Sequence, residues 1–464
     1  MRITPEIKLT LDEISTALGV ARNYQKNAEI GSIVTNSKEA LPNDIFVALP
    51  GESTNGENYI TEAKERGAYI ISSKSKDAEF FVSDTYLALL DIAAYYKSKL
   101  PCLQKTVAIT GSVGKTTTKN ILANMLSTCF KVHATKENYN NFLGLFHTVL
   151  TTPENTEVLV AELGMNHIGE ISILSKALSP DISIITNVGT AHIGNLGSRE
   201  MIAKAKLEIL DGMKTPNVIV LYEEPLLSKI EGRCTVSVNN SAADCCVIEK
   251  KLEQTHSTVD IYTPCGKIYS KRITLPGRHM LYAIAFSAQV MSMLGANINK
   301  IEHALKSIDS TSSRGRFIDI GNITVYDDTY SASFEAVIAD FELLSLFVER
   351  KRCCVIGDML ELGEHTENLH VCIGENAAKY GFEKIFAFGA FAKYVAEGAI
   401  AGGMTESQIF INEDTTNPER TAMQLQYNCK NGELVLVKAS HAVRAKRIID
   451  ILIKNINENK KGGV

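Results

Sequence analysis

Residues 105–119 read KTVAITGSVGKTTTK, and this stretch combines three local signals. The apolar, β-branched run at 107–109 predicts a strand. Gly111 and Gly114 predict a tight loop, because glycine adopts positive φ and lets the backbone come close to a ligand. Residues 119–126 fit a helix. A strand, a glycine loop and a helix start in this order predict an anion site, since loop amides and the helix N-terminus point toward the same ligand.

The two residues after the loop suit a nucleotide phosphate. Lys115 can reach the outer phosphates, and the hydroxyl of Thr116 is placed to ligate Mg²⁺. Gly111 and Gly114 enclose two residues, whereas the usual phosphate loop encloses four. A glycine turn with a chance lysine is the structural alternative. The strand before the loop and the helix after it favour a phosphate loop.

Length, charge and cysteine content describe a multidomain globular protein. A chain of 464 residues is too long to fold around one hydrophobic core, and we expect about three domains. The net charge of -5 argues against nonspecific nucleic-acid binding. No stretch approaches the ~18 apolar residues that a membrane span needs, and the N-terminus lacks an apolar signal core. The ten cysteines contain no CxxC motif, which favours a reduced, cytoplasmic protein over a disulfide framework or a zinc site.

The predicted elements divide the chain into three α/β parts. Residues 1–100 form a small domain with short strands at 45–49 and 68–71. Residues 101–310 carry the phosphate loop. Strands alternate with helices in this second part, at 105–110, 157–162, 182–186 and 217–221. Such alternation predicts a mostly parallel, doubly wound sheet, whose functional residues gather at the carboxyl ends of the strands.

Residues 311–464 are expected to form a Rossmann-like domain. Its strands are predicted at 323–326, 353–356, 385–388 and 434–437, each followed by a polar or glycine-containing turn. The domain lacks a GxGxxG fingerprint, so we infer no dinucleotide. Residues 312–316 would be the hinge, whose arginines either reach nucleotide phosphates or are solvated. The tail 455–464 has low complexity and is expected to be disordered.

Three polar features follow strands of the second domain. Glu162 ends an apolar run, the place where phosphate-loop enzymes hold an acidic metal ligand; an exposed strand-end glutamate is the alternative. His192 follows the strand at 182–186, and its alternative is an ordinary loop histidine. The segment 136–144 is rich in asparagine, which makes turns or hydrogen-bonds phosphate and carboxylate groups.

A lysine is predicted on the apolar face of a helix. Ser198 is a candidate N-cap for a helix that runs through Met213. At ~100° per residue, Lys206 shares a face with apolar residues, while Lys204 lies on the opposite, solvated face. A lysine in such a stripe usually extends its ammonium to water. The alternatives are a paired ammonium or a chemically altered one, such as a carbamate formed with CO₂, and spacing does not choose between them.

These stretches resemble the Mur ligases, the peptidoglycan-precursor amide ligases. Residues 111–117, GSVGKTT, are similar to the family's ATP loop. Residues 136–144, 162–171 and 357–364 resemble the branch that adds D-alanyl-D-alanine, and 45–49 with 56–60 resemble its uridine-nucleotide domain. The resemblance covers all three domains. It implies a monomeric, cytoplasmic ATP-dependent ligase that joins D-alanyl-D-alanine to UDP-N-acetylmuramoyl-tripeptide through an acyl phosphate. That reaction supplies cell-wall synthesis, and through it cell shape and division.

The resemblance also implies a role for each matching position. ATP would be bound by Gly111, Ser112, Gly114, Lys115, Thr116, Thr117, His279, Arg316 and Asp328. Two Mg²⁺ ions would be held by Thr116, Glu162, His192 and a carbamoylated Lys206. The catalytic set would be Lys115, Asn138, Glu162, His192 and Lys206.

Other positions depart from the family pattern, mainly in the first and third domains. The departures are Asn36, Met280, Ala283, Ser331, Ser333, Phe334, Ala439 and His441. They motivate an alternative, a paralogue that joins a different amine to a different carboxylate. A third possibility is a nucleotide-driven switch, or a relative that binds the UDP-sugar without ligating it. The retained phosphate and metal residues favour the ligase.

Overall fold

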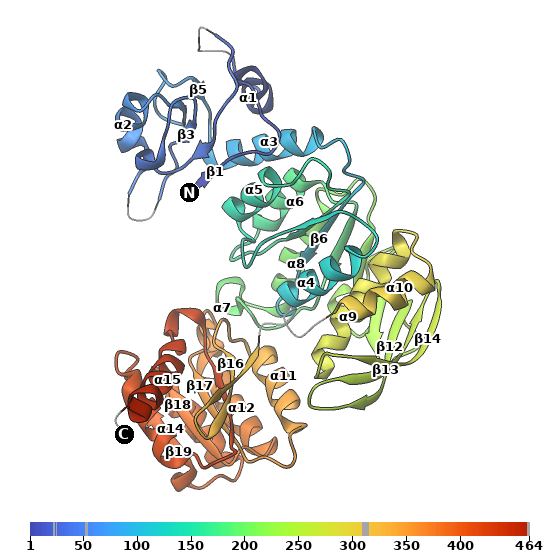
Figure 1. The fold of residues 1–464 in the computed structure, drawn as a ribbon, viewed down its shortest axis with the longest axis vertical. Helices are drawn as coiled ribbons and strands as arrows, with labels where there is room; N and C mark the ends of the chain where they lie inside the picture. Colours follow the sequence, from blue (N-terminus) through green and yellow to red (C-terminus); the bar gives the residue numbers. More distant parts are fainter. Residues whose placement is uncertain (22–23, 25, 52–53, 309–314, 462–464) are drawn as a thin grey trace. The chain divides into compact units, whose positions relative to one another are not determined.

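A computed structural model describes residues 1–461 except 22, 23, 25, 52, 53 and 309–314. The chain forms two compact units, one of residues 1–110, 126–184 and 205–219 and the other of 111–125, 185–204 and 220–464. Three sheets alternate with helices along the chain, which confirms the predicted α/β class (Figure 1). The predicted domain boundaries at residues 100 and 310 stay a prediction. Among the described residues, no helix is both long and apolar enough to cross a bilayer.

The N-terminal sheet has the order β1-β2-β3-β4-β5, and all its neighbours except β1 and β2 are parallel. Buried side chains such as Phe46 and Ile70 form its core. The predicted strands correspond to β3 and β4. The elements are β1 (Arg2–Ile3), α1 (Leu11–Leu18), β2 (Ile33–Val34), β3 (Ile45–Val47), α2 (Ile60–Glu65), β4 (Tyr69–Ser72), β5 (Phe80–Phe81) and α3 (Thr85–Ser98).

The central sheet has the order β14-β13-β12-β11-β10-β9-β6-β8-β7. The four predicted strands are confirmed as β6, β8, β9 and β10, and β6 pairs with β8 in parallel. The antiparallel extension β12–β14 was not predicted. The strands are β6 (Lys105–Thr110), β7 (Val132–Ala134), β8 (Val158–Glu162), β9 (Ile182–Ile185), β10 (Val218–Leu221), β11 (Cys234–Val238), β12 (Cys245–Leu252), β13 (Ser257–Thr263) and β14 (Gly266–Ile273).

One central helix ends earlier than predicted. The helix expected to run to Met213 stops as α8 at Leu207, and a 3₁₀ turn follows. The hydroxyl of Ser175 donates to Ile209 O at 2.6 Å and accepts from Gly212 N at 3.1 Å, so a tertiary contact takes up the backbone groups there. The central helices are α4 (Lys115–Leu126), α5 (Phe142–Leu150), α6 (Glu170–Leu178), α7 (Ile193–Leu196), α8 (Arg199–Leu207), α9 (Arg278–Met293) and α10 (Ile298–Ala304).

The third sheet has the order β15-β16-β20-β17-β18-β19 and is parallel except for β15 with β16. Helices α14 and α15 lie on one side of it and α11 and α12 on the other (Figure 1). The strands are β15 (Arg316–Ile320), β16 (Ile323–Asp328), β17 (Arg352–Gly357), β18 (Lys384–Phe388), β19 (Ile409–Asn412) and β20 (Leu434–Lys438). The helices are α11 (Phe334–Ser345), α12 (Thr366–Lys379), α13 (Ala392–Ala401), α14 (Pro418–Asn428) and α15 (Lys446–Lys461).

The C-terminal tail corrects one expectation. Disorder was predicted from residue 455, but α15 continues to Lys461. The helix packs Ile448, Ile449 and Leu452 into the core of the third sheet, and this buried face precedes the polar tail. Helix formation propagates from a packed turn at little cost, so the polar composition of the last turns was a poor guide.

Candidate active site

The phosphate loop has the backbone geometry that its glycines predict. Gly111 has a φ of +148° and Gly114 a φ of +83°. Helix α4 begins directly afterwards at Lys115, whose ammonium donates to Gly111 O at 2.7 Å and Ser112 O at 3.3 Å. A cation folded over the loop and a helix N-terminus beside it suit a polyphosphate. These residues therefore fit a nucleotide.

Gly111 is required by space as well as by φ. A Cβ built on Gly111 would lie 1.8 Å from Thr186 Oγ1. We expect Gly111→Ala to displace the loop and to weaken nucleotide binding at least roughly 10-fold, because both φ and the close approach become unfavourable. Titration with ADP checks this, with Gly432→Ala as a control at another positive-φ glycine, which has open space around its Cβ position. Equal ADP affinities of Gly111→Ala and wild type would contradict the expectation.

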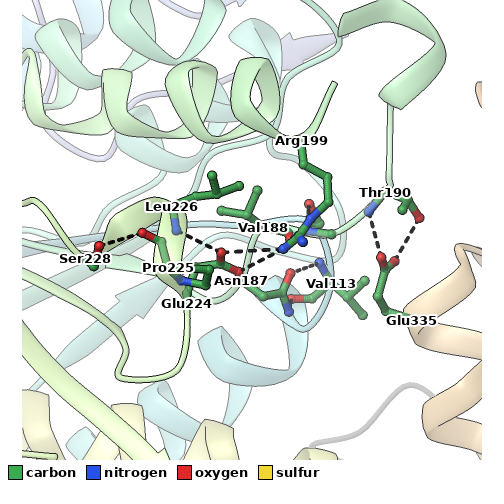
Figure 2. Close-up of polar contacts among 12 residues, drawn as sticks. Val113, Asn187, Val188, Thr190, Arg199, Glu224, Pro225, Leu226, Ser228 and Glu335 are labelled. Carbon is green, nitrogen blue, oxygen red and sulfur yellow. Dashed lines mark hydrogen bonds and ion pairs between the residues drawn. The ribbon is translucent and has the colours of Figure 1, made fainter. Parts of the chain in front are cut away.

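The segment that follows β9 holds the tip of the loop. Asn187 accepts from Val113 N at 3.0 Å and donates to Val113 O at 3.1 Å (Figure 2). Thr186 also donates to that carbonyl, at 2.6 Å. The hydroxyl of Ser112 accepts from Gly189 N at 2.9 Å, so this side chain braces the loop. The loop and residues 186–189 are therefore one hydrogen-bonded piece.

Asn187 was missed by the sequence reasoning. The signal available was its place directly after the predicted strand 182–186, followed by a glycine two residues on. A side chain that both accepts from and donates to one backbone residue replaces a missing strand neighbour. This explains why an amide stands here, although a turn asparagine looks the same in sequence.

Glu162 is a buried carboxylate at a strand end, not an exposed one. It is the last residue of β8, is 1% exposed and pairs with Ile109 of β6. The amide of Asn140 donates to Glu162 Oε1 at 2.9 Å. Asn140 belongs to the amide-rich segment 136–144, whereas Asn138, the position that the resemblance implies, is exposed and its role stays a prediction. A buried, oriented carboxylate of this kind suits a divalent cation.

His192 has an unusual backbone and a carboxylate partner. Its φ is +65°, and its Nδ1 lies next to the carboxylate of Glu361, whose own φ is +63°. Glu361 O also accepts from Gly194 N at 2.9 Å. A carboxylate at Nδ1 favours the proton on that nitrogen, the tautomer that presents Nε2 to a metal. Thr190 lies two residues before His192. It donates its N–H to the Glu335 carboxylate at 2.8 Å and its hydroxyl to the same group at 3.2 Å (Figure 2).

Lys206 faces inward, as the helical periodicity predicts. It is 1% exposed, whereas Lys204 is exposed. Its neighbours on the same face, Ile202 and Ile209, are fully buried. The helix therefore does not let this side chain extend to solvent, and the first of the three alternatives is wrong. The choice between a paired and a chemically altered nitrogen stays a prediction.

The predicted third-domain contact Asp328 belongs to a buried charge cluster. Lys438 forms ion pairs with Asp328 and with Asp340, the latter at 2.8 Å. Burial raises the pKa of Asp340 to about 7. Burial lowers the pKa of His279 to about 4, with the nearby charges of Asp328 and Lys438 acting in opposite directions. Arg316, the first residue of β15, is exposed, and residues 312–314 of the predicted hinge lie outside the described residues.

The lowered pKa of His279 predicts a pH dependence of stability. Its pKa lies below the ordinary 6.5 in the folded state, so the unfolded chain binds the proton more readily. The stability that neutral His279 contributes is therefore fully present above pH 6.5 and is lost as the pH falls toward 4, by at most about 3 kcal/mol. Urea unfolding at pH 7 and 4.5 measures the loss, and His279→Gln should reduce it. An unchanged pH slope in that variant would contradict the prediction.

Family models match the central and C-terminal parts of the chain, and known proteins match nearly all of it. The Mur ligase middle domain matches residues 109–291, and the Mur ligase glutamate ligase domain matches residues 313–441. A UDP-N-acetylmuramoyl-tripeptide--D-alanyl-D-alanine ligase of Bacillus subtilis is 30% identical, over 97% of this chain and 99% of its own length.

Solved structures agree with the sequence comparison. A crystal structure of MurF from Acinetobacter baumannii superposes with a TM-score of 0.87 at 26% identity, covering 97% of this chain and all of its own. MurF from Thermotoga maritima in complex with ADP has a TM-score of 0.81 at 29% identity, covering 92% and 98%. These matches show that the chain belongs to the Mur ligase family, in the branch that contains MurF.

Proposed function

We propose that this protein is the ATP-dependent ligase that joins D-alanyl-D-alanine to UDP-N-acetylmuramoyl-tripeptide. One observation carries the proposal: the phosphate loop, braced by Asn187, follows a strand that is paired with the strand ending in buried Glu162. The names of the relatives supply the substrates, and the ADP complex of the Thermotoga enzyme supports the nucleotide. The relatives favour this reaction over a paralogue with a different amine and carboxylate.

The residues divide the work of activating a carboxylate. The acceptor carboxylate and the ATP γ-phosphate are both anions, so their approach is opposed electrostatically. ATP supplies the phosphoryl group that makes the carboxyl an acyl phosphate, which the amine then displaces. Lys115 and the amides of residues 111–117 hold phosphate oxygens and offset the negative charge in the transition state. His279, Arg316 and Asp328 are proposed to contact the rest of the nucleotide.

Two Mg²⁺ ions are proposed to bind at the retained ligand set. Thr116 supplies a hydroxyl and Glu162 a carboxylate, the oxygen donors that Mg²⁺ prefers. The resemblance to the Mur ligases adds the imidazole nitrogen of His192 as a further ligand. Asn140 holds the Glu162 carboxylate in place, and Glu361 holds the His192 ring. These outer partners orient the ligands, because each fixes the side chain that carries the donor atom.

Lys206 is proposed to be carbamoylated. The resemblance to the Mur ligases implies this modification at Lys206, and the position of Lys206 on the inner face of the helix, 1% exposed, agrees with it. The neutral amine would form an N–C bond to CO₂ and release a proton, giving an anionic group that would join the proposed cation ligands. A carbamate supports metal binding where an ammonium would oppose it.

The assignment of parts follows the family arrangement. Residues 1–100 are proposed to bind the UDP-sugar, residues 101–310 ATP, and residues 311–464 the incoming dipeptide. We further propose that the protein is a monomer in the cytoplasm. The ten free thiols support a reducing compartment. The departures at Asn36, Ser331 and Phe334 are then tolerated variation.

A substrate panel followed by mass spectrometry tests the proposed pair. The purified protein is given ATP, Mg²⁺ and UDP-N-acetylmuramoyl-tripeptide with D-alanyl-D-alanine, L-alanyl-L-alanine or D-alanine alone. We expect the pentapeptide product with D-alanyl-D-alanine as the main product. A product with another amine, and none with D-alanyl-D-alanine, would overturn the substrate assignment and leave the ligase chemistry standing.

A further inference from the structure

Arg199 donates two hydrogen bonds to one backbone carbonyl of residues 186–189, the segment that is hydrogen-bonded to the phosphate loop. It is the first residue of α8, and its Nε and Nη2 donate to Val188 O at 3.2 and 2.8 Å (Figure 2). Val188 stands between Asn187, which binds Val113 of the loop, and Gly189, whose N–H binds the loop hydroxyl of Ser112. The position of this carbonyl therefore affects both contacts that brace the loop.

Glu224 contacts the same guanidinium, at its Nη2 nitrogen. It follows β10, is 8% exposed, and its two carboxylate oxygens lie 3.3 and 3.5 Å from Arg199 Nη2. Leu226 N also donates to this carboxylate, at 3.3 Å (Figure 2). A planar guanidinium meets a carbonyl and a carboxylate with donors in a fixed geometry, whereas an ammonium is a point charge on a flexible stem. The pair is therefore built for arginine.

We propose that Arg199 and Glu224 are positioning residues for nucleotide binding. They hold Val188, and Val188 in turn sets Asn187 and Gly189 against the tip of the phosphate loop. Neither residue belongs to the loop or to the metal ligands. The inference rests on the proposed function only in taking residues 111–117 as the nucleotide site.

The direction of the effect follows from the geometry. The loop amides that are proposed to bind phosphate point in directions set by the loop conformation. If Arg199 and Glu224 no longer hold Val188, these amides are less well oriented before the nucleotide binds. The binding of the acceptor and of the dipeptide does not use these amides. Loss of the pair should thus weaken nucleotide binding selectively.

Arg199→Lys is the principal variant. It keeps the positive charge opposite buried Glu224 and removes the fork that reaches Val188 O. We expect Kd for ADP and KM for ATP to rise roughly 10-fold, the lower range for an outer partner that orients a site. KM for the other two substrates should stay within about twofold, because a purely local brace does not reach them. Equal affinity for ADP in the variant and wild type would overturn the proposal.

Glu224→Gln and the double variant test whether the pair acts as a unit. If Glu224 works through Arg199, the double variant should bind ADP about as weakly as Arg199→Lys alone, since neighbouring residues in one network are not additive. Losses that simply add would mean that Glu224 acts on its own, and would contradict the arrangement.

Arg350→Lys is a matched control for general destabilisation. Arg350 donates from Nε to Gly432 O at 2.8 Å and from Nη2 to Glu433 O at 3.2 Å, the same kind of contact just before β20 of the third sheet. We expect a lowered Tm and an unchanged Kd for ADP. If Arg350→Lys raised the Kd for ADP as much as Arg199→Lys does, the effect would be one of general destabilisation, and the proposal would be overturned.

ADP binding does not require ligation, so the two proposals can fail separately. A wild-type protein that binds ADP but forms no product would contradict the proposed function only. A wild-type protein that does not bind ADP would contradict both.

Discussion

Lys115→Ala is expected to lower kcat/KM for ATP by roughly 10²–10³, the cost of removing one electrostatic contact to a transition state. In the structure the ammonium lies over the loop, 2.7 Å from Gly111 O and 3.3 Å from Ser112 O. Those carbonyls hold the charge over the loop that is proposed to bind the phosphates. The decrease in kcat/KM for ATP should be larger than the decrease in ADP affinity, because the lysine charge stabilises the transition state of γ-phosphate transfer more than it stabilises bound ADP.

Steady-state kinetics and ADP titration of one preparation separate the two effects. Lys105→Ala is the matched control, since Lys105 begins β6, the strand that leads into the loop, and is an exposed partner of Asp181 at 3.4 Å. It should behave as wild type, because an exposed ion pair contributes little. A Lys115→Ala protein with wild-type kcat/KM would mean that another cation holds the phosphate.

Lys206→Ala is expected to abolish ligation, and a short carboxylate such as acetate, with millimolar bicarbonate, should partly restore it. The variant removes the nitrogen that would carry the carbamate and opens space in a buried stripe for a small anion. Restoration would show that a negative charge is missing, whereas a lost packing contact would not respond to acetate.

Two controls make the Lys206 result specific. Lys204→Ala changes the exposed lysine two residues earlier and should leave ligation unchanged. Lys206→Met keeps the length and apolar contacts of the side chain, and should be inactive although folded. Ligation at the wild-type rate in either Lys206 variant would remove the carbamate from the account.

Local signals predicted the parts of the site that depend on one element. The loop at residues 111–114 follows from glycine chemistry, and the inward face of Lys206 follows from the period of a helix. The burial of Glu162 was weighed against exposure and proved correct, because an apolar run of β8 continues to its last residue. Such features need no knowledge of distant residues.

Contacts that join distant segments were the ones missed. Asn140 and Asn138 look alike in sequence, and only the path of the turn before α5 brings Asn140 to Glu162. Lys438 meets Asp340 because β20 lies beside β16 and near α11, which strand patterns do not reveal. The end of α8 likewise depends on Ser175 of another helix.

The most direct test of the proposed ligase is phosphate release from ATP with Mg²⁺ and UDP-N-acetylmuramoyl-tripeptide, measured with and without D-alanyl-D-alanine. Release should require both substrates, and the product should carry the added dipeptide by mass spectrometry. ATP hydrolysis that is independent of D-alanyl-D-alanine, or nucleotide binding without any release, would contradict the account.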